Sequence, residues 1–427
     1  MNRKKITYQS DLLGEEYTVF HHESGLPIYV FPKQMSTSYA LLATNFGAVD
    51  HALDAAGQLK LPDGVAHFLE HKLFFNEDGT DSFERFSALG ADANAYTSHT
   101  RTVYLFSCTD HFAEALAELI DFVTHPYFTE ESVAKEQGII EEEIRMCLDN
   151  PYDRCYYNML EGLYVNHPVK TDICGSVASI SAITPKILYD THSTYYRLSN
   201  MALVVCGDVN AEEVLEIANA HLPQAAEQGT VPRRLVEEPV IAHRATVTEE
   251  GHVAKPIFSI GVKDVHIPDD PDERLKRDAA MAILNEMLFS EAGELYNKLY
   301  GNGMISPELS ADYVLTRDFG FLQIAGESEE PERVMDEIWQ YFEKLHREGF
   351  STEDFERCKR IEYAEYIKSF DSTEEIANTL LSFVFEGVEL FSYADVILGI
   401  QPEDVAALLS KLFDPACRTL SVIYPDS

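Results

Sequence analysis

The sequence predicts an α+β protein made of two homologous domains, each with a largely antiparallel sheet and helices packed on one face. The chain of 427 residues is long enough for two domains of ordinary size, and its hydrophobic fraction of 45% is typical of globular proteins. Short β-rich segments occur in hairpin-like groups beside runs of helical periodicity, which favours α+β over strict alternation of strand and helix. The two halves of the chain also resemble each other.

Each half is expected to begin with strands, continue through helices and end in a β-branched strand. The predicted strands lie at residues 17–21, 39–46 and 201–206 in the first half, and at 257–262, 319–326 and 419–424 in the second.

A polar segment without periodicity separates the halves. Residues 223–234 contain Gly and Pro and no apolar pattern, which predicts a linker. We therefore expect a first domain at residues 1–222, a linker at 223–240 and a second domain at 241–427.

The first half contains the spacing His-x-x-Glu-His, at His67, Glu70 and His71, on a stretch with helical character. Histidines at i and i+4 of a helix lie about 5–6 Å apart at Cβ, so both can reach one zinc ion at about 2.0–2.1 Å. Glu70 points to the same side. The alternative is a pair of ordinary core histidines, but three ionisable groups among apolar neighbours are costly to bury unless something pairs them.

The second half repeats the order of elements after about 200 residues, which indicates domain duplication because solenoid repeats are much shorter. Segments beginning at Phe128 and Phe350 both start a helix with a Thr or Ser cap and acidic residues. In this alignment, the positions of the motif are occupied by Ala282, Asn285 and Glu286. One half therefore has the metal-binding pattern and the other lacks it.

A carboxylate-rich helix is expected at residues 136–146. Catalytic zinc keeps three protein ligands and one open position, so a third ligand should come from another element. Glu136 and Glu143 are two helical turns apart and share a face. The alternative for an acidic run is a solvated helix face, which we prefer for Glu141 and Glu142. Periodicity alone does not select Glu143 among its neighbours.

Composition excludes several classes of function. The net charge of −39 disfavours nucleic-acid binding, and its ordinary meaning is solubility, with attraction of cationic peptides as the alternative. The seven scattered cysteines without C-x-x-C indicate reduced thiols and a cytoplasmic location. We expect no signal peptide, no membrane span and no ATP-binding loop.

Three segments together resemble the pitrilysin (inverzincin) family of zinc peptidases, which includes insulin-degrading enzyme and mitochondrial processing peptidase. They are the His67–His71 motif, residues 90–97 and the helix at 136–145. The resemblance covers both halves and is greatest to small bacterial two-domain members similar to the processing peptidase. It implies one Zn²⁺ per chain bound by His67, His71 and Glu143, with Glu70 as general base on zinc-bound water and Glu136 orienting the site.

The resemblance also implies how a peptide is bound. Asn94, Ala95, Tyr96 and Thr97 are expected to form an edge strand that binds the substrate backbone, whereas the alternative is an ordinary sheet strand. Family members commonly carry an Arg and a Tyr in the second half that hold the substrate. Here Tyr300 occupies the expected Arg position and no second Tyr is evident. A homologous partner subunit, in a homo- or heterodimer, is expected to supply them, each chain forming half of a clamshell around a peptide chamber.

The expected function is that of a zinc-dependent endopeptidase that hydrolyses peptides or small unfolded proteins inside this chamber. The alternative is a non-catalytic scaffold or partner subunit of a heteromeric peptidase.

Overall fold

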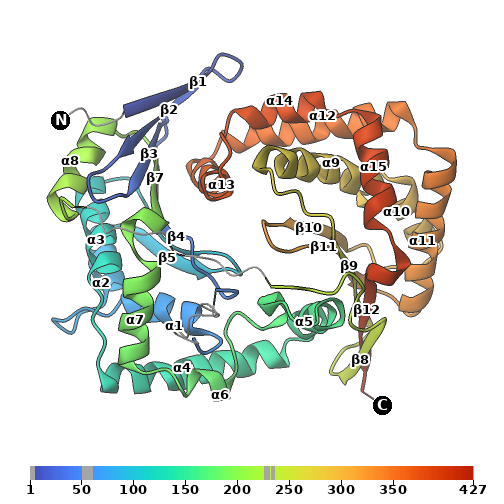
Figure 1. Ribbon diagram of the computed structural model, residues 1–427, viewed down its shortest axis with the longest axis horizontal. Coiled ribbons are helices and arrows are strands. Elements are labelled where there is room, and N and C mark those ends of the chain that lie inside the picture. The colour runs from blue at the N-terminus through green and yellow to red at the C-terminus, as the bar shows by residue number, and fades with distance from the viewer. Residues whose placement is uncertain (1–4, 51–60, 226–230, 232–235, 427) are drawn as a thin grey trace. The chain divides into compact units, whose positions relative to one another are not determined.

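The computed structural model describes residues 5–50, 61–225, 231 and 236–426 (Figure 1). Two compact units form. Unit 1 comprises Met1–Ile144, Asp172–Arg234 and Ile367–Phe385, and unit 2 comprises Arg145–Thr171, Leu235–Tyr366 and Glu386–Ser427. Much of the linker expected at 223–240 falls outside the described residues. No helix in the described part of the chain combines the length and the apolar character needed to cross a bilayer.

Unit 1 is built on a seven-stranded sheet in the order β1-β2-β3-β7-β4-β6-β5. Its strands are β1 (Lys5–Ser10), β2 (Glu15–His21), β3 (Pro27–Pro32), β4 (Ser38–Thr44), β5 (Asp92–Thr97), β6 (Thr102–Cys108) and β7 (Met201–Gly207). All neighbours are antiparallel except the parallel pair β3 and β7. Every residue of β4 and β7 is buried, which places the centre of this core at the middle of the sheet.

The helices of unit 1 are α1 (Val65–Leu73), α2 (Ser82–Ala88), α3 (Phe112–Thr124), most of α4 (Glu130–Asp149), α6 (Val177–Ile180), α7 (Pro185–Tyr195), α8 (Ala211–His221) and nearly all of α13 (Thr373–Glu386), with the short 3-10 turn η2 (Leu198–Asn200). The 3-10 turn η1 (Pro168–Lys170) belongs to unit 2. Aromatic packing joins α1, α3 and β6 on one face of the sheet through Phe74, Phe122 and Tyr104.

Unit 2 has a five-stranded sheet in the order β10-β11-β9-β12-β8. Its strands are β8 (Thr246–Gly251), β9 (Ile257–Lys263), β10 (Leu309–Leu315), β11 (Gly320–Glu327) and β12 (Arg418–Pro425). Its helices are α5 (Pro151–Leu163), α9 (Pro271–Phe289), α10 (Glu294–Gly301), α11 (Pro331–Glu348), most of α12 (Thr352–Ser369), α14 (Ser392–Gly399) and α15 (Pro402–Leu412), followed by the turn η3 (Pro415–Cys417).

The two sheets confirm the internal repeat. The order β3-β7-β4-β6-β5 in unit 1 matches β8-β12-β9-β11-β10 in unit 2, and both contain one parallel pair at the same place. In unit 1, β4 is followed by α1, then by the hairpin β5–β6 and the helices α3 and α4. In unit 2, β9 is followed in the same way by α9, the hairpin β10–β11 and the helices α11 and α12. The expected strands and the largely antiparallel sheets are therefore confirmed.

The units are not continuous in sequence, as the expected ranges 1–222 and 241–427 would be. Helix α5 from the first half belongs to unit 2, because its apolar side chains pack on β9 and β12. A Cβ at Gly261 of β9 would lie only 2.6 Å from Met159 of α5, so glycine permits this close packing. Helix α13 from the second half belongs almost entirely to unit 1.

Candidate metal centre

Helix α1 presents His67 and His71 one turn apart. Their Nε2 atoms are 3.2 Å from each other, and His67 is only 7% exposed. The start of α1 is held by a close backbone contact: a Cβ at Gly64 (φ 86°) would lie 2.4 Å from the carbonyl oxygen of Cys174. Glycine tolerates both this conformation and this approach. The helix therefore has a fixed start one turn before the first histidine.

Helix α4 brings Glu143 to both histidines. Its Oε1 lies 3.4 Å from Nε2 of His67, and its Oε2 lies 3.5 Å from Nε2 of His71. The hydrogen bond to His67 lowers the pKa of Glu143, helped by the charges of both histidines and opposed by burial. Among the three consecutive glutamates of this helix, the structure thus brings Glu143 to the histidine pair, and Glu142 is exposed.

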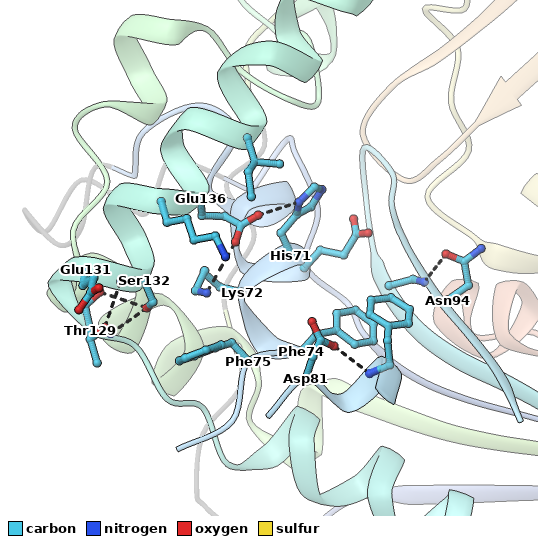
Figure 2. Close-up of a pocket in the computed structure, with 15 residues that line it drawn as sticks. His71, Lys72, Phe74, Phe75, Asp81, Asn94, Thr129, Glu131, Ser132 and Glu136 are labelled. Carbon is cyan, nitrogen blue, oxygen red and sulfur yellow. Dashed lines mark hydrogen bonds and ion pairs between the residues drawn. The ribbon is translucent and has the colours of Figure 1, made fainter. Parts of the chain in front are cut away.

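Glu136 lies beside His71, as Figure 2 shows. Nδ1 of His71 donates to Oε1 of Glu136 over 3.2 Å, while Nζ of the buried Lys72 lies 3.6 Å from Oε2. Burial lowers the pKa of His71, but the hydrogen bond to Glu136 and the nearby carboxylates outweigh it, and the net shift is upward. Burial also opposes ionisation of Glu136, yet its contacts with His71 and Lys72 lower its pKa overall. When Nδ1 of a neutral His71 carries the proton, Nε2 has a free lone pair, and this is the nitrogen that faces Glu143.

These donors fit a zinc ion. Tetrahedral zinc with bonds of about 2.0–2.1 Å places its ligand atoms about 3.3–3.4 Å apart. Nε2 of His67 and Nε2 of His71 are 3.2 Å apart, and the two carboxylate oxygens of Glu143 lie 3.4 Å from the first nitrogen and 3.5 Å from the second. Imidazole nitrogen and carboxylate oxygen are also common donors to zinc. These three residues could therefore hold the metal.

Glu70 extends from α1 toward strand β5. The hydroxyl of Thr97 donates to its Oε2 over 2.6 Å. Glu70 and His71 both line the cavity beside this cluster. The position of Glu70 suits a base beside a metal rather than a ligand.

A cavity of about 680 Å³ opens beside this cluster within unit 1 (Figure 2). Glu70, His71 and Glu136 line one part of it, and aromatic and aliphatic side chains line another; these are Phe74, Phe75, Phe83 and Ile139. A pocket with a few convergent polar groups and an apolar lining is typical of a substrate site.

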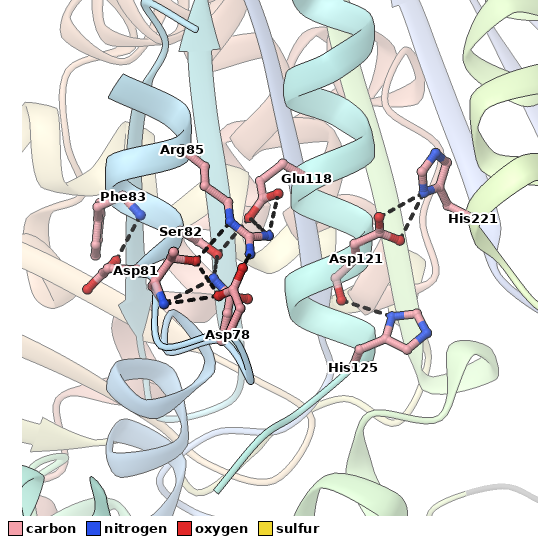
Figure 3. A network of polar contacts seen from close by, with 11 residues as sticks. Asp78, Asp81, Ser82, Phe83, Arg85, Glu118, Asp121, His125 and His221 are labelled. Atoms are coloured by element: carbon pink, nitrogen blue, oxygen red, sulfur yellow. Dashed lines mark hydrogen bonds and ion pairs between the residues drawn. The ribbon is translucent and has the colours of Figure 1, made fainter. Parts of the chain in front are cut away.

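A network of ion pairs supports the segment that borders this cavity. Arg85 of α2 bonds Asp78 at 2.8 Å and Glu118 of α3 at 3.1 Å, while Asp81 caps α2 by accepting from the amide of Phe83 (Figure 3). In the same view, His125 and His221 both contact Asp121 of α3. These histidines serve the packing of α3 and α8.

The predicted peptide-binding strand is only partly directed to the cavity. β5 is an edge strand, since its described ladder partner is β6 alone. Asn94 and Ala95 line the cavity. Thr97 instead bonds Glu70, and the hydroxyl of Tyr96 donates to Oδ1 of Asn378 in α13 over 3.1 Å.

The sequence analysis missed two residues near the histidines. Lys72 adjoins the motif, but nothing in the periodicity showed that its ammonium group would be buried against Glu136. Cys174 is distant in sequence, and its sulfur lies within 4.8 Å of ligand atoms of His67 and Glu143. We take His67, His71 and Glu143 as the candidate ligand set, because the Glu143 carboxylate contacts both histidines at 3.4 and 3.5 Å and their nitrogens are 3.2 Å apart.

Tyr300, which the sequence analysis placed at the position of the family's Arg, lies on α10, is 48% exposed and stacks on Tyr296.

Comparison with known proteins identifies the family. A family model described as insulinase (peptidase family M16) matches residues 60–176, and one described as the peptidase M16 inactive domain matches residues 182–362. The chain is 36% identical over 420 residues to the uncharacterized zinc protease YmfH of Bacillus subtilis, covering 96% of this chain and 97% of that protein. It is 25% identical over 380 residues to the zinc protease PqqE of Helicobacter pylori, covering 85% and 83%. The chain belongs to peptidase family M16.

Solved structures agree with this assignment. An M16-like peptidase from Alicyclobacillus acidocaldarius matches with a TM-score of 0.92 and 30% identity, covering 99% of this chain and 100% of that chain. Pitrilysin matches with a TM-score of 0.77 at 15% identity, covering 98% of this chain and 46% of its own, which supports the fold alone. The resemblance inferred from the sequence motifs is confirmed at the level of the family and the fold.

Proposed function

We propose that this chain is a zinc-dependent endopeptidase in which His67, His71 and Glu143 bind the metal and Glu70 is the general base. The observation that carries the proposal is the convergence of two histidine nitrogens and the Glu143 carboxylate at 3.2 to 3.5 Å, next to the Glu70 carboxylate, which borders a cavity. The zinc-protease names of the relatives support the same reaction class.

Each residue has a distinct task in the proposed reaction. Zinc bound here would polarise the scissile carbonyl and acidify a water molecule. Glu70 takes a proton from the attacking water and then delivers it to the leaving amine. Glu136 accepts the Nδ1 proton of His71, which keeps the imidazole oriented with Nε2 free to ligate.

The proposed substrate is an extended peptide. The open edge of β5 offers backbone groups for an added strand, and Asn94 and Ala95 on this edge line the cavity. Main-chain pairing recognises many sequences, so unfolded segments of peptides or small proteins are suitable substrates. Folded domains would not present such a strand.

We also propose a dimer with a homologous subunit in the cytoplasm. The proposal is supported by Tyr300, which replaces the Arg that commonly holds substrate in this family. Among the described residues, which include all seven cysteines, none joins a disulfide, in keeping with a reducing compartment. Sedimentation of the chain with and without homologous subunits, together with peptidase assays, tests whether activity requires a partner subunit. Full activity of a monomer would contradict it.

The decisive test of the reaction compares Glu70→Gln with the wild type. We expect one zinc per wild-type chain by elemental analysis and cleavage of a quenched peptide that a chelator abolishes. Glu70→Gln should keep its zinc and its fold but lose turnover by at least about 100-fold, since a positioned base contributes about 10²–10⁴-fold. Normal turnover in this variant, or a wild type that cleaves equally well without metal, would refute the assignment.

A further inference from the structure

We propose that Thr97 is a positioning residue for Glu70, and that Asn378 of α13 holds the strand that carries it. The second half of the sequence would thereby help to fix the general base of the first. The inference rests on the proposed peptidase function and extends it to residues outside the metal-binding motif.

The contact between Thr97 and Glu70 has the length of a charge-assisted bond. Its 2.6 Å separation lies in the range of about 2.5–2.7 Å expected for a hydroxyl donating to a carboxylate. The β-branched threonine is stiff at χ1, so the direction of its hydroxyl is set by the strand. A glutamate side chain otherwise has several rotamers. Binding Oε2 to the strand leaves Oε1 to exchange the proton.

The neighbouring residue anchors the same strand from the opposite side. Successive side chains of a strand point to opposite faces of the sheet, so Tyr96 extends away from Glu70. Its hydroxyl donates to Oδ1 of Asn378 over 3.1 Å, and Nδ2 of Asn378 donates to the hydroxyl of Tyr39 on β4 over 3.4 Å. Helix α13 thus contacts the face of the sheet opposite α1.

A second contact one helical turn further along α13 supports the hairpin. Arg101, between β5 and β6, donates to Oγ of Ser382 over 2.7 Å, and Ser382 is four residues after Asn378. An edge strand has a ladder partner on one side only and gains most from such support. The geometry therefore connects α13, β5 and Glu70 in one chain of direct contacts.

The first experiment compares Thr97→Val, which removes the hydroxyl at constant shape, with Thr97→Ser, which keeps it. We expect Thr97→Val to lower kcat by about 10- to 100-fold, as small misplacements of catalytic groups do, with KM and zinc content unchanged. Thr97→Ser should recover most of the loss. Thr7→Val is the matched control, since Thr7 lies on β1 at the other edge of the sheet and bonds Thr18.

A binding measurement separates positioning from direct substrate contact. In the Glu70→Gln background, the affinity for a fluorescent peptide can be measured by anisotropy without turnover. Thr97→Val should leave that Kd within about twofold, because Thr97 acts through Glu70. A Kd raised tenfold would make Thr97 a substrate contact and overturn the inference.

The role of α13 is tested by Asn378→Ala, with Glu375→Ala as control at an exposed position on the same helix. Asn378→Ala should lower kcat by about 3- to 10-fold, and this loss should largely vanish in the Thr97→Val background, because both act on one group. Independent, multiplicative losses would overturn this part. If the wild type shows no metal-dependent cleavage, the proposed function itself is wrong. If the wild type is active and Thr97→Val has the same kcat, only the inference about Thr97 is wrong.

Discussion

The helix pair α1–α4 in unit 1 and its counterpart α9–α12 in unit 2 occupy equivalent places in two sheets of the same topology, yet they differ in chemistry. In unit 1, Glu70 of α1 accepts a hydrogen bond from Thr97 on β5. In unit 2, Asn285 of α9 donates to the backbone of Ala311 on the equivalent strand β10. The position that would act as a base in one unit serves strand packing in the other.

The charges around the two helix pairs also differ. In unit 1, histidines and Lys72 lower the pKa of Glu136 and Glu143 despite burial. In unit 2, burial raises the pKa of Asp278 to about 7, and the charges of Glu362 and Glu386 act in the same direction. Cationic neighbours thus lower the pKa of the carboxyl groups beside the histidines, whereas burial and neighbouring acidic groups raise the pKa of Asp278.

The largest expected effect comes from removing a ligand. His71→Ala should abolish stoichiometric zinc and lower kcat/KM by at least about 10³-fold, because both the metal and its activation of water are lost. Asn285→Ala, at the position equivalent to Glu70 in unit 2, should keep zinc and activity near wild type. Elemental analysis and peptide cleavage measure both. A zinc-free but active His71→Ala would remove the distinction between the two helix pairs.

A smaller effect is expected when the support of Glu136 is removed. Lys72→Met should weaken zinc binding by about 10- to 100-fold, because the buried Glu136 loses its cation and holds His71 less firmly. Competition with a chromophoric chelator measures the affinity. Lys135→Met is the control, since Lys135 lines the same cavity but is exposed. Equal affinities in the two variants would mean that Lys72 only fills space.

The protonated carboxylate of unit 2 predicts a pH-dependent stability. The pKa of Asp278 is raised from 3.8 to about 7, so its stabilising contribution is present below about pH 4 and is lost as pH rises through 7. Asp278→Asn mimics the protonated acid and should increase the free energy of unfolding of unit 2 by about 1–3 kcal/mol at pH 8.

Calorimetry at pH 4.5 and pH 8 measures this change. The gain from Asp278→Asn should shrink toward the acidic condition, whereas Glu356→Gln, at an exposed position on α12, should change little at either pH. An equal gain at both pH values would show that packing, and not titration, is responsible.

The smallest effect is expected for Cys174→Ser. His67, His71 and Glu143 already supply the three protein ligands that a catalytic zinc needs, so the variant should keep one zinc per chain with affinity within about threefold of wild type. Chelator competition provides the measurement. A large loss of zinc affinity would place the Cys174 thiol among the ligands. The thiol would then be a further difference from unit 2, where the buried Cys358 is a free cysteine.

Much of the fold and the core of the candidate site follow from local sequence rules. His67, Glu70 and His71 come together because residues three and four apart on a helix are neighbours, whatever surrounds them. The strands are visible as β-rich segments, and the duplication appears as two similar orders of elements. These features depend on residues close in sequence, which is where pattern analysis is strongest.

Other features depend on contacts between distant segments, and only the tertiary structure decided them. Periodicity left Glu143 equivalent to its neighbours until α4 was placed against α1. Cys174 lies near the site because its backbone packs against Gly64 at the start of α1. Thr97 donates a hydrogen bond to Glu70 and does not line the cavity. The exchange of α5 and α13 between the units had no local signal, because the partner of an apolar helix face is set by the shape of the sheet it meets and not by its order in the chain.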